Sequence, residues 1–108
     1  MMSKWADYVI TAVRYESADR SREGKRIVTV EVRMDLGGRV GIAELWRREQ
    51  ILDAVNHDHE TFVTSSMAAN GTWLKGAHVR VIRVNGIDYI RIDRTPVTND
   101  DLGGLSEF

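Results

Sequence analysis

The sequence predicts an α+β domain in which one helix packs on a mostly antiparallel sheet of about five strands, in the order β-β-α-β-β-β. Three observations support this prediction: an apolar–polar alternation over Ile27–Leu36, an Asn85-Gly86 turn between two apolar runs, and a helical apolar stripe that begins at Ile51. The chain of 108 residues has the size of one domain and contains no internal repeat and no linker that would divide it.

The segment Tyr8–Tyr15 is rich in β-branched and aromatic residues, which favour a strand. Simple alternation places Tyr8, Ile10 and Ala12 on one face of the strand. It places Val9, Thr11, Val13 and Tyr15 on the other face. Neither face is polar, so we expect this strand to be covered on both sides or to be central in the sheet.

A polar turn region over Glu16–Lys25 leads to Ile27–Leu36, where apolar and polar residues alternate with a period of two. This pattern predicts a half-buried strand, antiparallel to the first. Its apolar face carries Val28, Val30, Val32, Met34 and Leu36.

Glycines at positions 37, 38 and 41 end this strand, and a helix is expected over Trp46–Asn56. The helix has an apolar stripe with the spacing of a helix packed on a sheet, formed by Ile51, Leu52, Ala54 and Val55. A weaker third strand is expected over Glu60–Met67, followed by a loop over Ala68–Gly76 that contains an Asn70-Gly71 turn.

The next two apolar runs, His78–Val84 and Ile87–Asp93, flank Asn85-Gly86, the strongest short hairpin signal. A two-residue loop fixes the register, so that Val84 pairs with Ile87 and Arg80 with Arg91. The predicted core face is Val79, Val81, Ile90 and Ile92, and the opposite face is His78, Arg80, Ile82, Val84, Ile87, Tyr89, Arg91 and Asp93.

Residues 1–6 are expected to form a flexible extension, and residues 96–108 a tail that docks on the domain or on a second copy. Leu102, Leu105 and Phe108 recur every third residue, so one helical or 3₁₀ turn would point all three the same way. Two glycines between them make ordering of the tail costly.

The composition excludes several classes of protein. A net charge of −1 lacks the basic excess of a non-specific nucleic-acid binder. The absence of cysteine excludes a disulfide scaffold, a thiol nucleophile and an iron–sulfur cluster. The N-terminal residues do not resemble a signal peptide, and no run approaches the roughly 20 apolar residues that span a bilayer, so we expect a cytoplasmic protein without a membrane partner.

The sequence contains no catalytic motif such as Gly-x-Ser-x-Gly, a phosphate-binding glycine-rich loop or a His-Glu-x-x-His helix, so we expect neither an enzyme nor a cofactor. His57-Asp58-His59 has the spacing of part of a metal site, but a site needs three or four converging ligands. We interpret this segment as a polar loop that closes the helix, and predict no metal.

The predicted pairing of Arg80 with Arg91 is unfavourable, because like charges directly opposite each other repel. Asp93 or Glu31 would offset the repulsion. Alternatively, an anionic ligand bridges the two guanidinium groups. The candidate ligand-binding residues, for nucleic acid or a phosphorylated small ligand, are Arg80, Arg91, Tyr89 and His78.

The three tryptophans have different expected places. Trp46, at the start of the predicted helix, is expected in the core. Trp73, in a glycine-flanked loop, is the better candidate for an exposed anchor. Trp5 falls in the N-terminal extension.

Four segments resemble, in order, the small bacterial and phage proteins grouped as domain of unknown function 3892. They are Tyr8–Tyr15 (YVITAVRY), Trp46–Ile51 (WRREQI), Asn85–Arg91 (NGIDYIR) and Asp101–Phe108 (DLGGLSEF). The resemblance spans almost the whole chain and implies a stand-alone small domain without an assigned activity. Two positions depart from it: Arg47 stands where a helix-capping Ser or Thr is expected, and Gly104-Leu105-Ser106 where Asn-Leu-Pro is expected.

We therefore expect a non-enzymatic binding module whose partner is another protein or a second copy. Its expected interaction residues are Trp73, Leu102, Leu105 and Phe108. The alternative is a binder of nucleic acid or a phosphorylated small ligand through the arginine-bearing sheet face. An exposed apolar patch would favour the first function, and arginines that converge without a carboxylate would favour the second.

Overall fold

The computed structural model describes residues 4–16, 26–37 and 39–108, and within these residues it has the predicted α+β class with one helix and mostly antiparallel strands. The elements follow the chain as β1 (Tyr8–Tyr15), β2 (Ile27–Met34), β3 (Glu44–Arg47), α1 (Arg48–Asn56), β4 (Phe62–Met67), β5 (Trp73–His78), β6 (Arg80–Val84), β7 (Ile87–Arg91) and β8 (Ser106–Glu107). The turn region predicted over Glu16–Lys25 lies, after Glu16, outside the described residues.

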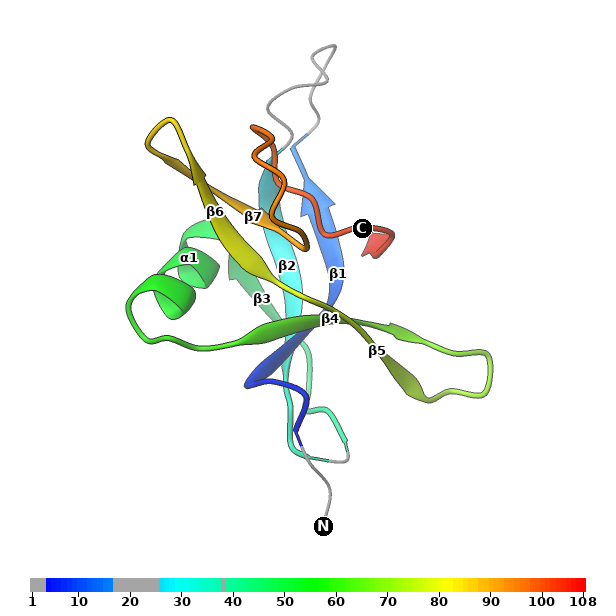
Figure 1. Ribbon diagram of the computed structural model, residues 1–108. Helices are drawn as coiled ribbons and strands as arrows, with labels where there is room; N and C mark the ends of the chain where they lie inside the picture. The colour runs from blue at the N-terminus through cyan, green and yellow to red at the C-terminus, as the bar shows by residue number, and fades with distance from the viewer. Residues whose placement is uncertain (1–3, 17–25, 38) are drawn as a thin grey trace.

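The first strand, β1, is central in the main sheet, which explains why neither of its faces is polar (Figure 1). The strand order is β3-β2-β1-β4-β5, with β8 as a further partner of β1. β1 pairs antiparallel with β2, and parallel with β4 through residues 8–10 and with β8 through residues 12–13. β6 and β7 form a separate two-stranded sheet.

A β-bulge in β1 changes which side chains face the core. Ile10 pairs with Val32 but Ala12 pairs with Glu31, so Thr11 is the extra residue. After it the alternation is reversed, and Val13 joins Ile10 in the main core cluster. The predicted division of the strand into two faces is therefore wrong after Thr11, because simple alternation assumes an unbroken ladder.

A second irregularity has the same effect in β2. Tyr15 pairs with Ile27 while Arg14 pairs with Thr29, so Val28 has no partner in β1. Ile27 takes the core position, and Val28 is exposed although the alternation placed it on the apolar face. From Val30 onward the predicted face is correct as far as Val32.

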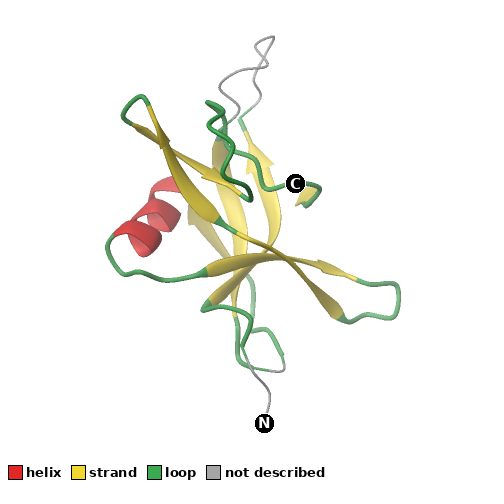
Figure 2. Cartoon of the chain, in the orientation of Figure 1, coloured by secondary structure: helices red, strands yellow, loops and turns green. Residues whose placement is uncertain are grey.

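The core lies between the main sheet and a layer formed by the helix, the β6–β7 hairpin and the C-terminal segment (Figure 2). Ile51 of α1, Ile90 of β7 and Leu102 are fully buried there. The helix begins at Arg48 rather than at the predicted Trp46, because Trp46 belongs to β3. The missing cap at Arg47 is partly replaced by Gln50, whose Oε1 accepts the Arg47 N–H at 2.8 Å.

The sequence did not predict strands β3, β5 and β8. The third strand that it did predict, β4, begins at Phe62 instead of Glu60. The loop expected over Ala68–Gly76 covers most of β5, which contains Gly76 although a glycine weakens a strand. The glycine is there because β5 approaches β4 closely: a Cβ at Gly76 would lie 2.2 Å from Thr64 Oγ1. The Asn70-Gly71 turn joins these two strands.

The N-terminal segment is ordered closer to the chain start than expected. The Trp5 N–H donates to Asp35 Oδ2 at 2.7 Å, and Ala6 is buried against Val9 and Val63. The flexible extension predicted over residues 1–6 is therefore wrong for these two residues. Residues 1–3 of that extension lie outside the described residues.

The β6–β7 hairpin has the predicted register, with Arg80 opposite Arg91 and Val84 opposite Ile87. Asn85 and Gly86 both have positive φ, 54° and 82°, as a type I′ turn requires.

Replacing Gly86 with valine is expected to lower the free energy of unfolding by about 1–3 kcal/mol, because a β-branched residue tolerates positive φ poorly. A Cβ at Gly86 would meet no atom within 4 Å, so the effect comes from the backbone alone. Urea unfolding measures it. Gly104→Val, where a Cβ also meets open space, is the control and should cost less; equal losses would contradict the assignment of the turn.

Candidate functional site

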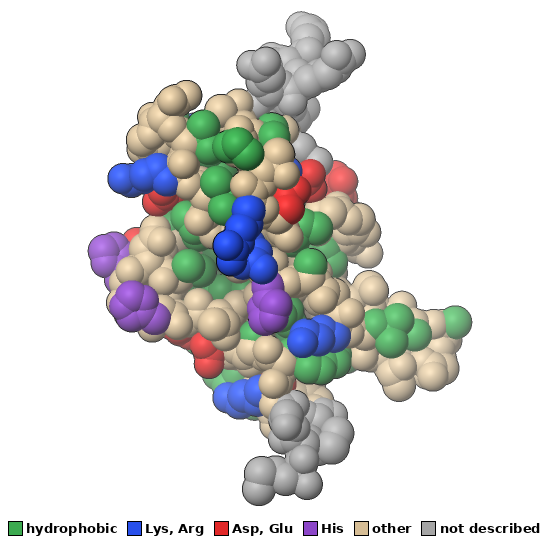
Figure 3. All heavy atoms as spheres, in the orientation of Figure 1, with side chains coloured by type: hydrophobic (Ala, Val, Ile, Leu, Met, Phe, Trp, Pro, Cys, Tyr) green, Lys and Arg blue, Asp and Glu red, His purple; other side chains and the backbone are tan. Residues whose placement is uncertain are grey.

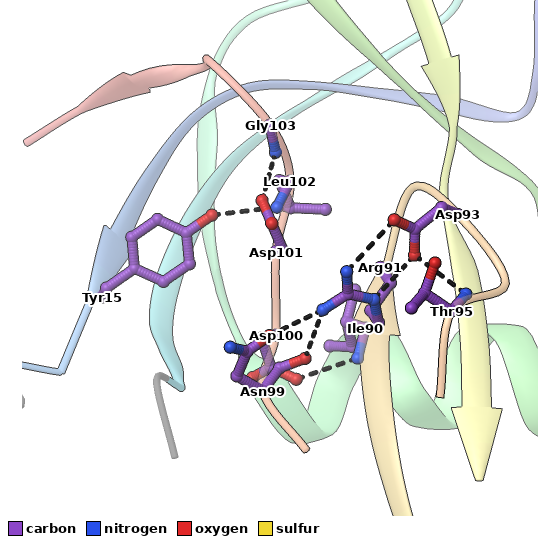
Figure 4. A network of polar contacts seen from close by, with 10 residues as sticks. All are labelled: Tyr15, Ile90, Arg91, Asp93, Thr95, Asn99, Asp100, Asp101, Leu102 and Gly103. Carbon is purple, nitrogen blue, oxygen red and sulfur yellow. Dashed lines mark hydrogen bonds and ion pairs between the residues drawn. The ribbon is translucent and has the colours of Figure 1, made fainter. Parts of the chain in front are cut away.

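On the arginine-bearing face of the hairpin, the protein's own residues match the charge of Arg91 (Figure 4). Arg91 is only 5% exposed, and its Nε and Nη2 donate to Asp93 Oδ1 and Oδ2 at 2.7 and 3.1 Å. Hydrogen bonding to Asp93 raises the pKa of Arg91, and the same hydrogen bond lowers the pKa of Asp93. Of the two carboxylates expected to offset the Arg80–Arg91 repulsion, Asp93 binds Arg91, and Arg80 has no side-chain partner among the described residues.

The predicted ligand-binding residues separate into two pairs. Tyr89 and Arg91 are buried, because the segment after the hairpin runs beside β7 and its Asp101 N–H donates to Ile90 O at 2.9 Å. The expectation that these two side chains face a ligand is therefore wrong. His78 is exposed and Arg80 is half-buried, so both still reach the surface.

A buried carboxylate that the sequence did not single out joins three parts of the chain. Asp100 is fully buried and accepts four hydrogen bonds, from Arg48 Nε (2.7 Å) and Nη2 (3.1 Å), Ile27 N (2.9 Å) and Ile90 N (2.8 Å). The hydrogen bond to Asp100 raises the pKa of Arg48. The four hydrogen bonds that Asp100 accepts all come from residues of α1, β2 and β7. The cluster of Asp100 and these donors therefore stabilises the fold. Asn99-Asp100-Asp101 looks like any polar turn, and no sequence signal marks the middle residue.

The tail lies along the sheet in an extended form. Leu102 is buried and its N–H donates to the Tyr15 hydroxyl at 2.9 Å, while Leu105 packs half-buried against the core. Phe108 is partly exposed, with the Arg14 guanidinium 5.0 Å from its ring. The predicted helical turn is wrong, because the edge of β1 beyond β4 offers backbone groups that β8 pairs with.

The two larger aromatic candidates are both in contact with the protein. Trp73 begins β5 rather than lying in a loop, and the Arg33 guanidinium stands 5.2 Å from its ring. It is therefore not the free anchor that was predicted. Trp46 packs against Tyr8 and Phe62, at ring-centroid distances of 4.9 and 5.8 Å, on the edge of the core.

An open cleft of about 810 Å³ is lined by the start of β1, the end of β2, the segment that follows it and β3. Its floor includes Tyr8, Val32 and Trp46, which continue the apolar face of the core. Its walls include three apolar side chains that are exposed or half-buried, Met34, Leu36 and Val40, and the strongly exposed Ile42.

The neighbouring strand β3 is an end strand of the main sheet, so its outer edge has no strand partner among the described residues. Ile42, just before β3, is 81% exposed, and Leu45, within it, is 65% exposed. They are the most exposed large apolar side chains in the part of the chain that the structure describes. An edge strand with exposed apolar side chains is a place where another strand can add.

Two of the charged side chains that line the cleft form hydrogen bonds with other residues of its lining. Arg33 Nη1 donates to Gly41 O at 3.1 Å, and Trp46 Nε1 donates to Glu44 Oε1 at 3.1 Å. Arg39 completes the charged lining. No sequence pattern predicted this cleft, although the alternation over Ile27–Leu36 placed Met34 and Leu36 on an apolar face.

Among the described residues no group of three His, Asp or Glu side chains is arranged to hold a metal ion. The helix of the described part is too short to cross a membrane. No family model, curated protein or solved structure matches this chain. The resemblance to domain of unknown function 3892 stays a prediction.

Proposed function

We propose that this chain is a non-enzymatic protein-binding module that takes an extended segment of a partner protein at the outer edge of β3. The observation that supports this most directly is the exposure of Ile42 and Leu45 beside the open cleft. Exposed apolar side chains on an unpaired edge strand mark a place where another chain can bind.

Strand addition suits both the backbone and the side chains of this region. An added strand would satisfy the outward N–H and C=O groups of β3, which gives affinity. Every second side chain of that strand would point toward the cleft, whose floor is aromatic and aliphatic. The partner segment should therefore carry apolar side chains at alternate positions.

The cleft's polar side chains give little support to catalysis. Glu44 and Arg33 are hydrogen-bonded to the walls of the cleft, and no second carboxylate lines it. A second copy of the chain is the other occupant that fits an exposed edge strand, so the experiment distinguishes it from a different protein.

Peptides selected from a random phage-displayed library against the wild-type chain should bind Ile42→Asp at least about tenfold more weakly, because a charge at a desolvated apolar contact costs well over 1 kcal/mol. Ile42 is exposed, so this substitution should leave stability unchanged within about 0.5 kcal/mol. Fluorescence anisotropy with the selected peptides measures the affinities.

The control is Leu74→Asp, which changes an exposed apolar side chain on β5, at the opposite end of the sheet. The selected peptides should bind it like the wild type. Light scattering of the free chain tests self-association, which Ile42→Asp should abolish if a second copy is the occupant. Failure to enrich any peptide, together with a monomeric wild type, would rule out β3 as a binding edge.

A further inference from the structure

A second hollow, of about 490 Å³, lies between the end of α1, the start of β4 and the junction of β5 with β6. The Val79 N–H donates to Phe62 O at 2.9 Å and holds this junction against β4. The lining combines apolar and ionisable side chains, namely Val55, His59, Glu60, Thr61, Phe62, His78, Val79 and Arg80. Figure 3 shows basic side chains beside a histidine in the middle of the face drawn there.

Three side chains of this lining can carry positive charge and have no partner among the described residues. His59, His78 and Arg80 make no side-chain hydrogen bond or ion pair there. Arg80 stands opposite Arg91, whose own charge is matched by Asp93. Arg80 is therefore the cation of this pair that remains available to a ligand.

The neighbouring carboxylates are already engaged elsewhere. Interaction with Glu60, first by hydrogen bonding and then by its negative charge, raises the pKa of the Tyr8 phenol. Asp7, which approaches from the start of β1, accepts the Thr61 N–H at 2.9 Å and the Thr61 hydroxyl at 3.0 Å. The acids around the hollow thus have partners that do not include the three cationic side chains.

The backbone fixes the position of His59. Its φ is 55°, a left-handed conformation that histidine adopts more readily than most residues. The next residue, Glu60, donates its N–H to Ala54 O at 2.9 Å, which ties the loop to the helix end. His59 is thereby held on the same side as the β5–β6 junction.

We propose that this hollow binds the phosphate group of a small phosphate monoester, with Arg80 as the permanent charge and His59 and His78 as protonatable donors. A guanidinium offers paired N–H donors that match phosphate oxygens. Val55 and Val79 give the ligand's organic part an apolar surface. This site is separate from the β3 edge, and either can fail without the other.

Phenyl phosphate, followed by NMR, is the first probe. The ring-proton signals of His59 and His78 should shift on titration, whereas those of His57, which lines a different hollow and faces Asp53, should not. Arg80→Ala should raise the dissociation constant about tenfold, the effect of losing one charge-assisted contact. The control Arg83→Ala, on the same strand but paired with Asp88, should stay within about twofold of the wild type.

Sulfate is the second probe, because its charge does not change over the range from about pH 5.5 to 8 in which histidine loses its proton. Its affinity should fall about tenfold over that range, and His59→Asn, which tolerates positive φ, should flatten the profile. The proposal would be overturned if Arg80→Ala and Arg83→Ala had equal effects, or if the signals of all three histidines shifted equally. A sulfate affinity that does not change with pH would also overturn it. So would a chain that binds a single-stranded oligonucleotide but does not bind phenyl phosphate.

Discussion

Replacement of Asp100 by alanine should lower the free energy of unfolding by about 3–5 kcal/mol, because it leaves a buried cation without its counter-charge. The Arg48 guanidinium is mostly buried, and it would keep only the backbone oxygen of Asp88 as a hydrogen-bond acceptor. The N–H groups of Ile27 and Ile90 would also lose their acceptor. Urea unfolding followed by tryptophan fluorescence measures the loss.

The neighbouring Asp101 provides the matched control. Its carboxylate accepts one exposed hydrogen bond, from the Gly103 N–H at 2.8 Å, so Asp101→Ala should cost about 1 kcal/mol or less. Asp100→Asn keeps the shape and one acceptor oxygen, and should fall between the two alanine variants. If Asp100→Ala cost no more than Asp101→Ala, the buried cluster would not be a main support of the fold.

Removal of residues 102–108 should be the other strongly destabilising change, with a loss of at least about 3 kcal/mol. Most of this comes from Leu102, which is fully buried beside Ile90. Removal of residues 105–108 alone deletes β8 and should cost about 1 kcal/mol or less, because the contacts of a two-residue strand barely exceed the entropy of ordering it.

Thermal melting of the two truncated chains tests this difference, and light scattering reports whether either one changes its oligomeric state. A large loss from removing residues 105–108 alone would mean that β8 is a main support of the fold. No loss from either truncation would mean that the whole tail is dispensable, in conflict with the burial of Leu102.

The sequence was informative where local rules determine structure. The Asn85-Gly86 turn requires positive φ at two successive residues, so the turn and the register that follows from it could be predicted together. The bounds of β1 could be predicted for a similar reason, because an uninterrupted run of strand-favouring residues is bounded by polar ones.

Non-local contacts account for what could not be predicted. The bulge at Thr11 depends on how β1 pairs with β2, and it reverses the faces after it. The burial of Arg91 depends on Asn99, whose side chain accepts the Arg91 Nη1 at 2.6 Å and which lies in a turn with no strand signal.

The candidate sites follow the same division. His59 and Arg80 line one hollow only because the β5–β6 junction is fastened to the start of β4. The helix begins two residues later than the predicted Trp46, so Trp46 belongs to β3 and lines the cleft together with the exposed Ile42. In both cases the sequence shows the residues of the site, but it does not show which residues lie next to them in the fold.

The central place of β1 also has a kinetic consequence. Its three partners, β2, β4 and β8, come from successively more distant parts of the chain, and the last pairs Ala12 with Ser106. Closing such long loops costs entropy before the contacts form, so a high contact order slows folding. The β1–β2 pairing is the most local of the three and is the natural nucleus, with β4 joining later and β8 last. On unfolding we expect the reverse order, with β8 the first strand to detach. The slowest amide hydrogen exchange should therefore occur in β1 and β2 and not in β8.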